Sequence, residues 1–320
     1  MKINLDKPKY IIVLGTTFSG SGAIFDYLNG RGDLYDPLIG EEYLLPILPN
    51  GLMALESVSD KSFDPATTEY VLTQFKSIAY KLMRYWTNIS NDENLNRRIP
   101  FYKDAIEKFI NDISIADFPM RLLWRDELLQ PPIKHFLEKI QKRAGFKKKV
   151  AQTRLIISQK ELVTAAQKMH DRMFQSSAYG RPILLDQGGS GWNPIESTKY
   201  FSDRKIALVT RDPRDQFAEI KHYKKGTSVE GFVDWYKEMQ RRLRQIDDSK
   251  VLFIRFEDFV KKNEKFTEIL CNHLSLSLSN LSNYQPDLSK KNIGKFKQLI
   301  TQKELEIIES NLDKYIYGDK

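Results

Sequence analysis

A glycine- and serine-rich segment near the N-terminus has the composition of an anion-binding loop. Residues 15–22 read GTTFSGSG, and they lie between an apolar run at 10–14 and a helical pattern at 23–29. A glycine-rich turn at the start of a helix directs several backbone N–H groups toward one point, and its small residues let an anion approach them. The segment therefore predicts a phosphate or sulfate site, although such a connection also occurs without a ligand.

The same segment disfavours two common nucleotide-binding motifs. A Walker A loop, G-x-x-x-x-G-K-[ST], supplies a lysine to the phosphates and a hydroxyl to magnesium. Gly15 and Gly20 have that spacing, but Ser21 and Gly22 stand where the lysine and the hydroxyl residue belong. The chain also lacks the G-x-G-x-x-G pattern of dinucleotide-binding folds. A nucleoside-triphosphate-dependent kinase is therefore the less favoured enzyme class.

Two further segments place charged residues directly after apolar runs. Arg211 follows the run at 205–209 and opens the sequence RDPRD, in which Asp212 is expected to cap a helix that starts at a proline. An arginine in this place can bind phosphate through two N–H groups, and an ion pair between Arg211 and a neighbouring aspartate is the structural alternative. The sequence RFEDF at 255–259 is better explained by a buried charge pair that braces the edge of a sheet.

The elements that must position these residues follow an α/β pattern. Apolar runs predict buried strands at 10–14, 182–186, 205–209 and 251–255. Helical patterns occur at 23–29, 160–177, 213–224, 229–246, 263–274 and 301–314, and further amphipathic stretches lie near 66–86, 102–113 and 131–143. The alternation predicts a P-loop-like parallel sheet flanked by helices, with ligands at the carboxyl ends of the strands. We expect a single domain over 1–320 with a helical insertion over about 57–180, where no convincing strand is seen.

Composition restricts the class of protein further. The chain has 320 residues with 41% hydrophobic content, which is enough for one large core. Its formal charge of +8 suits anionic ligands but is too diffuse to predict a nucleic-acid partner. Cys271 is the only cysteine, and neither an apolar leader nor a run of membrane-spanning length is present. We therefore expect a cytoplasmic protein without disulfides, and the apolar insertion leaves room for a homodimer surface.

Taken together, the segments resemble the sulfotransferase family that uses 3′-phosphoadenosine 5′-phosphosulfate (PAPS), in particular bacterial carbohydrate-type members. The first family motif, P-[KR]-[ST]-G-[ST]-[ST], is similar to 18–24, and the second, R-[DN]-P-[RK]-D, is matched at 211–215. The bacterial pattern R-[YF]-E-D-[LF] is matched at 255–259, and the stretch 290–297 resembles the basic closing loop G-x-[WF]-[KR]. An acidic residue upstream corresponds to Asp186. The order and spacing of these motifs agree with the family.

The resemblance implies a donor site without a metal. The 5′-phosphosulfate would bind the first loop, and the 3′-phosphate would meet Arg211, Lys290 and Lys291. The donor residues implied in the first loop are Thr17, Phe18, Ser19, Gly20, Ser21, Gly22 and Ala23. Two departures stand out: the family's basic loop residue falls at Gly20, and a serine that binds the 3′-phosphate in many members is replaced by Glu219.

The resemblance also implies a hydroxyl acceptor and a carboxylate base. Glycan sulfotransferases place a glutamate after the first helix, in a segment that resembles GEEY at 40–43. The expected base is Glu42, then Glu41, then Asp36, with His222 as a weaker alternative and a simple solvated role as the structural one. The expected acceptor is a glycan, surface polysaccharide or glycolipid, with the insertion as its wall. A degenerate protein that binds nucleotide or glycan without turnover is the second alternative.

Overall fold

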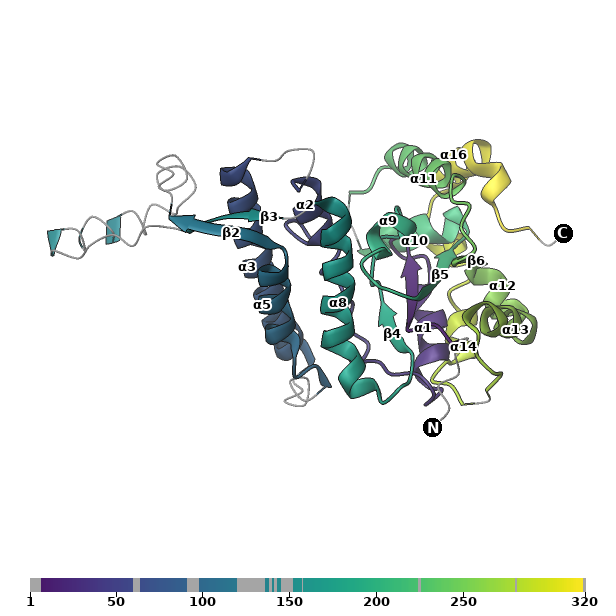
Figure 1. Ribbon diagram of the computed structural model, residues 1–320. Coiled ribbons are helices and arrows are strands. Elements are labelled where there is room, and N and C mark those ends of the chain that lie inside the picture. The colour runs from purple at the N-terminus through teal and green to yellow at the C-terminus, as the bar shows by residue number, and fades with distance from the viewer. Residues whose placement is uncertain are drawn as a thin grey trace.

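The computed structural model describes residues 7–59, 64–90, 98–119, 152–156, 158–223, 226–279 and 281–318, with 136–137, 140 and 143–144. A four-stranded parallel sheet of order β4-β1-β5-β6 forms its centre (Figure 1). Its strands are β1 (Tyr10–Gly15), β4 (Ile183–Asp186), β5 (Arg204–Thr210) and β6 (Val251–Arg255). The predicted fold class and all four predicted strands are confirmed, but β6 lies at the edge of the sheet and is only partly buried, with Phe253 41% exposed.

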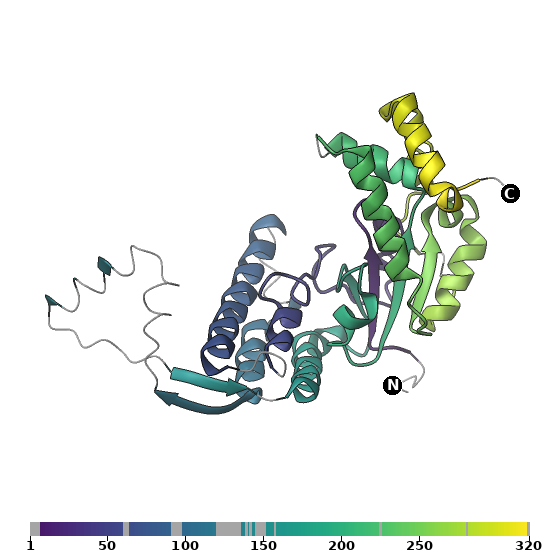
Figure 2. The same ribbon diagram turned by 90° about the horizontal axis from the view of Figure 1, so that it is seen from above.

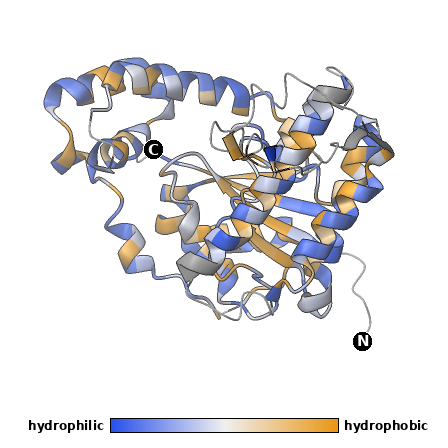
Figure 3. Ribbon diagram, turned by 90° about the vertical axis from the view of Figure 1, so that its left-hand side faces the viewer, coloured by the Kyte–Doolittle hydropathy of each residue, from blue (hydrophilic) through white to orange (hydrophobic). Residues whose placement is uncertain are grey.

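Both faces of this sheet are buried, as expected for parallel strands. Along β1, Tyr10, Ile12 and Leu14 belong to one apolar cluster, whereas Ile11 and Val13 belong to the other. One face is covered by α1 (Ser21–Asn29), α12 (Phe256–Lys261) and α13 (Asn263–Leu274). The other is covered by α8 (Gln159–Ala178) and α11 (Val229–Leu243). Figure 3 shows the apolar strands in the middle and polar residues on the outer sides of the helices.

The remaining elements complete the layers. The helices at 65–90, 102–112, 213–223 and 302–312 match predicted helical patterns, whereas the short helices at 52–57, 194–198, 286–290 and 296–299 were not predicted. They are α2 (Leu52–Ser57), α3 (Pro65–Ser90), α5 (Tyr102–Asp112), α9 (Pro194–Thr198), α10 (Pro213–Tyr223), α14 (Pro286–Lys290), α15 (Phe296–Leu299), α16 (Gln302–Leu312) and the 3-10 turn η1 (Asp313–Tyr315). No helix within the described ranges is both long enough and apolar enough to cross a membrane.

The expectation that the insertion holds no strand was wrong. Strand β2 (Ser114–Pro119) pairs antiparallel with β3 (Gln152–Ile156), and this ribbon extends away from the body in Figures 1 and 2. A two-stranded ribbon in this place does not need a continuous apolar run, since Ile115 on β2 is 64% exposed. The helix predicted near 131–143 falls mostly outside the described residues.

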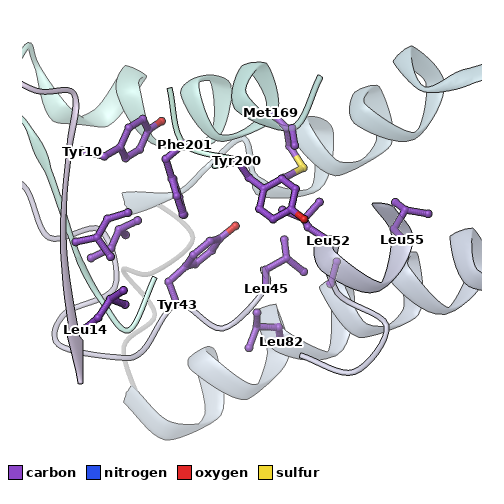
Figure 4. Close-up of a cluster of buried hydrophobic side chains, with 14 of the residues drawn as sticks. Tyr10, Leu14, Tyr43, Leu45, Leu52, Leu55, Leu82, Met169, Tyr200 and Phe201 are labelled. Atoms are coloured by element: carbon purple, nitrogen blue, oxygen red, sulfur yellow. The ribbon is translucent and has the colours of Figure 1, made fainter. Parts of the chain in front are cut away.

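A buried aromatic cluster joins the insertion to the sheet. Tyr43 is fully buried and packs against Trp86 of α3 and Phe201, as Figure 4 shows for Tyr43 and Phe201. His170 of α8 bonds the Tyr43 hydroxyl and the Tyr200 carbonyl oxygen, both at 2.8 Å. Burial lowers the pKa of His170 to about 4, so this ring is neutral and serves packing. The segment that precedes Tyr43 is thus fixed by helices of the insertion.

Candidate functional site

A pocket of about 590 Å³ lies at the carboxyl ends of β1 and β4. This is the edge of an open α/β sheet at which ligands bind. The loop at 15–22 forms one wall, and Gln187 with the glycine-rich segment 189–192 forms another. Glu42 and Glu219 complete the charged part of the described lining. The pocket therefore combines the predicted anion loop with the first-ranked carboxylate.

Backbone conformation shapes the anion loop. Phe18 and Gly20 adopt left-handed conformations, with φ of 57° and 84°, and α1 begins at Ser21 directly afterwards. A Cβ atom on Gly20 would lie 2.4 Å from the ring of Phe256, so both space and conformation demand glycine there. The first turn of α1 has N–H groups without intrahelical partners, and they line the end of the helix that favours an anion.

Two glutamine side chains that the sequence prediction did not assign hold this loop in place. Gln216 is fully buried in α10, and its Nε2 donates to the carbonyl oxygens of Thr16 at 3.1 Å and Thr17 at 2.6 Å. Gln187 accepts from the Gly15 N–H at 3.2 Å and donates to Ser21 Oγ at 3.0 Å. Both glutamines follow strands that flank β1, and that position is the signal by which they could have been found.

Ser19 leaves one hydroxyl in the pocket lining unsatisfied. The residue is 1% exposed, and its Oγ has no hydrogen-bond partner in the described structure. A buried hydroxyl without a partner is costly, and a bound oxyanion would satisfy it. This orphan hydroxyl and the helix N-terminus are independent observations that fit a phosphate or sulfate group.

Arg211 lies behind the pocket lining and is paired with a glutamate. Its Nη1 donates to Glu219 Oε2 at 2.9 Å and to the Phe18 carbonyl oxygen at 3.0 Å. Its Nη2 donates to the carbonyl oxygen of Asn292 at 2.6 Å. The predicted alternative, an Arg211–aspartate pair, was wrong because Arg214 takes that role with Asp212 at 2.8 Å. Arg211 thus ties the anion loop to the C-terminal segment.

The C-terminal basic segment reaches the site through a residue that was not singled out. Lys290 and Lys291 are both exposed, and Lys290 pairs with Asp287 at 3.2 Å. Neither lysine belongs to the described pocket lining. Lys295 Nζ lies instead 3.0 Å from Glu219 Oε1, so Lys295 shares the partner of Arg211.

The third charged segment serves the framework, as predicted. Glu257 is 1% exposed, accepts from the Asp212 N–H at 2.9 Å and lies 3.4 Å from Arg255 Nε. The Asp212 carboxylate in turn accepts from the Arg214 N–H at 2.8 Å, as a cap of α10 does. These contacts brace the ends of β5 and β6.

The three candidate bases occupy different environments. Glu42 lines the pocket, and partial burial, with a smaller effect of Glu41, raises its pKa. Glu41 is not part of the described lining. Asp36 accepts from the N–H groups of Leu38 at 2.9 Å and Gly40 at 2.6 Å, which gives it a structural role in the turn. Of the three, Glu42 is the one that belongs to the described pocket lining.

Asp186, which matched an acidic position of the family but received no role, lies beside Glu42. The two residues form a parallel bridge, and the Asp186 carbonyl oxygen accepts from the Tyr43 N–H at 2.9 Å. Burial, with the negative charge of Glu42 as a second cause, raises the pKa of Asp186 to about 7. Its Oδ1 is buried and has no partner in the described structure.

The described pocket lining contains no residue of the interval 57–180, so none of the described residues of the insertion forms the wall that we expected. The insertion instead supports the backbone of the pocket rim, because Trp86 Nε1 of α3 donates to the Glu42 carbonyl oxygen at 3.1 Å. The segment at 189–192 borders the pocket, and Trp192 within it packs edge-on against Trp235. Among the described residues, no cluster of three or more His, Cys, Asp or Glu could hold a metal ion.

Comparisons with known proteins gave structural matches alone. No family model and no curated protein sequence matches the chain. A sulfotransferase domain of the Synechococcus PCC 7002 olefin synthase is 13% identical with a TM-score of 0.46, over 99% of both chains. A sulfotransferase domain from the curacin biosynthetic pathway is 12% identical with a TM-score of 0.43, over 97% of this chain and 99% of that one. Sulfotransferase STF1 from Mycobacterium tuberculosis H37Rv is 10% identical with a TM-score of 0.38, over 91% of this chain and 78% of that one.

Proposed function

We propose that this protein is a sulfotransferase that moves a sulfuryl group from PAPS to a hydroxyl of a glycan, surface polysaccharide or glycolipid. The observation that carries the proposal is the convergence of a backbone anion loop and the Glu42 carboxylate on one pocket of about 590 Å³. The motifs at 211–215 and 255–259, in family order, support it. The cytoplasmic location and the homodimer stay predictions.

The residues present fit the phosphosulfate end of the donor. The N-terminus of α1, the orphan hydroxyl of Ser19 and the hydroxyl of Ser21 offer hydrogen-bond donors in one loop. When bound, the donor supplies an activated sulfuryl group whose departure leaves charge on a phosphate oxygen. The loop would stabilise that charge with fixed dipoles, and the chain would contribute positioning rather than covalent chemistry.

Glu42 is the proposed general base. A base must lie within hydrogen-bond reach of the acceptor hydroxyl, and Glu42 is the candidate acid on the pocket rim. Its raised pKa keeps it a stronger base than an ordinary carboxylate. The Glu42 carboxylate would take the hydroxyl proton as the acceptor oxygen attacks, with Leu44, Ile47 and Trp192 forming the acceptor side of the described pocket.

The geometry of Gly20 favours a different register of the first motif. A long basic side chain at Gly20 would run into Phe256, so the single glycine of P-[KR]-[ST]-G-[ST]-[ST] is better placed at Gly20 itself. In this register Phe18 replaces the basic residue, and Ser21 keeps one of the paired hydroxyls. Phe18 stacks on Tyr223 with ring centroids 5.2 Å apart.

A second candidate function, binding without turnover, is favoured by the same replacement. The loop offers no side-chain cation at Phe18, and Glu219 neutralises Arg211. The double variant Glu41→Gln/Glu42→Gln separates the two functions. An enzyme keeps donor binding and loses sulfuryl transfer to acceptor, whereas a binding module has no transfer to lose.

The test of the donor site is calorimetric titration with adenosine 3′,5′-bisphosphate and with ATP, each with and without magnesium. We expect the bisphosphate to bind without magnesium and Arg211→Ala to weaken it strongly. Arg214→Ala is the matched control, since Arg214 pairs with Asp212 and Glu309 outside the described pocket lining. Preference for ATP with magnesium would support a kinase, and failure of both nucleotides to bind would overturn the proposal.

A further inference from the structure

We propose that the Glu219 carboxylate is an internal competitor of the donor's 3′-phosphate, and that it limits how tightly the pocket holds 3′-phosphorylated nucleotides. The inference rests on the proposed function for the identity of the nucleotide. It adds a residue of this chain that sets the affinity for both donor and product.

The Glu219 side chain bridges two cations at the pocket. It lies on α10, is 13% exposed and belongs to the pocket lining. Its Oε2 lies 2.9 Å from Arg211 Nη1, and its Oε1 lies 3.0 Å from Lys295 Nζ. The cluster of Arg211, Lys295 and Glu219 therefore has a net charge of +1. Arg211 Nη2 also lies 3.5 Å from Glu219 Oε1, so both carboxylate oxygens are engaged by cations, as two oxygens of a bound phosphate would be.

Arg211 has little freedom to serve a second anion while Glu219 stays in place. Its side chain is 2% exposed, and the carbonyl oxygens of Phe18 and Asn292 take further N–H groups. Its Nε is buried and has no partner in the described structure, so the guanidinium is not saturated. A phosphate dianion that approaches Arg211 must therefore displace the carboxylate or lie against its negative charge, and either course weakens binding.

The pairing has a consequence for turnover. Donor and product both carry the 3′-phosphate, so the competition weakens both to a similar extent. When the product leaves, Glu219 returns to Arg211 and Lys295, and this favours release. A nucleotide without a 3′-phosphate leaves the ion pairs of Glu219 with Arg211 and Lys295 intact. Its affinity should therefore not rise when the Glu219 carboxylate is removed.

The test compares adenosine 3′,5′-bisphosphate with ADP in titrations of the wild type, Glu219→Gln and Glu219→Ser. We expect the variants to bind the bisphosphate at least about tenfold more tightly, because a like charge a few ångströms from the phosphate is gone. ADP affinity should change less than about twofold. Glu238→Gln is the matched control: it removes the same charge from an exposed glutamate paired with Arg241 and Arg242. It should leave both affinities unchanged.

Thermal unfolding of each variant is measured first, and Glu219→Ser provides a smaller neutral residue if Glu219→Gln folds poorly. Unchanged or weaker bisphosphate binding in folded variants, with both nucleotides still bound by the wild type, would overturn the competitor role and leave the proposed function intact. Failure of the wild type and every variant to bind either nucleotide would instead overturn the proposed function, and the inference with it.

Discussion

Two walls of the same pocket are built in different ways. The anion loop at 15–22 presents backbone groups, with a left-handed Gly20 and the N-terminus of α1. The opposite rim presents one charged side chain, Glu42, whose main chain is tied to Trp86 of α3 and, through Tyr43, to Asp186 of β4. Local conformation thus forms the first wall, which the distant Gln187 and Gln216 side chains hold in place, whereas distant packing alone positions the second.

The contrast shows why backbone and side-chain sites differ in their sensitivity to change. Backbone amides keep their direction as long as the loop conformation persists, so we expect side-chain changes that preserve this conformation to be tolerated there. A catalytic carboxylate must point at one oxygen atom, and small displacements of its supports reduce the rate. The predictions below separate the two walls, from the largest expected effect to the smallest.

Glu42→Gln should remove chemistry at the rim and leave the anion loop intact. We expect sulfuryl transfer to fall by about 10²–10⁴-fold, the usual contribution of a general base, with bisphosphate binding unchanged. Transfer assays with a glycan acceptor, together with calorimetry, measure the two effects. Glu41→Gln is the matched control and should change the rate little. An equal loss of rate in Glu41→Gln would move the base to that residue.

Asp186→Asn should alter the pH dependence of stability. The folded-state pKa of Asp186 is about 7, above the ordinary value near 3.8, so the native state binds the proton more tightly than the unfolded chain does. The contribution of Asp186 to the free energy of unfolding is therefore fully present below about pH 4. It falls between pH 4 and 7 and is lost above pH 7. The asparagine variant should be more stable than the wild type at pH 8 by up to about 4 kcal/mol, with little difference at pH 4. Urea unfolding at both pH values checks this, and an equal difference at both would exclude the titration of Asp186 as its cause.

Gly20→Ala should break the anion loop alone. The Cβ contact with Phe256 and the positive φ together predict a loss of about 2–4 kcal/mol in the free energy of unfolding and strongly weakened bisphosphate binding. Gly22→Ala is the control, since a Cβ on Gly22 meets nothing within 4 Å and the residue lies inside α1. It should be neutral or slightly stabilising. Denaturant unfolding of both variants decides the point, and similar losses in both would contradict the account of Gly20.

Trp86→Phe should weaken the rim from within the insertion. Loss of the Nε1–H donor leaves the Glu42 carbonyl oxygen without this bond, so we expect a stability loss of about 1–2 kcal/mol and a rate several-fold lower. Phe75→Leu, also in the core of α3, should cost stability without changing the rate per folded molecule. If both variants lower the rate equally, the effect comes from general loosening rather than from the Glu42 support.

Short-range patterns were enough to predict much of the fold. Runs such as 10–14 and 205–209 identify buried strands because both faces of a parallel sheet need apolar residues. The loop at 15–22 was identifiable because glycine spacing and the following helix are neighbours in the chain. The ribbon β2–β3 escaped prediction because β2 holds an exposed Ile115 rather than a continuous buried run, and because the pairing joins segments far apart in sequence.

The sequence by itself determined the four strands of the parallel sheet and their long flanking helices, the loop at 15–22 and the acidic segment that carries Glu42. Only the tertiary structure decided that Gln216 braces that loop across 199 residues, that Lys295 rather than Lys290 meets Glu219, and that Asp186 lies beside Glu42. The reason is physical: elements form from local conformational preferences and periodic burial. The partner of a charged or amide side chain is set instead by which chain ends the folded sheet brings together, and no spacing along the chain encodes that distance.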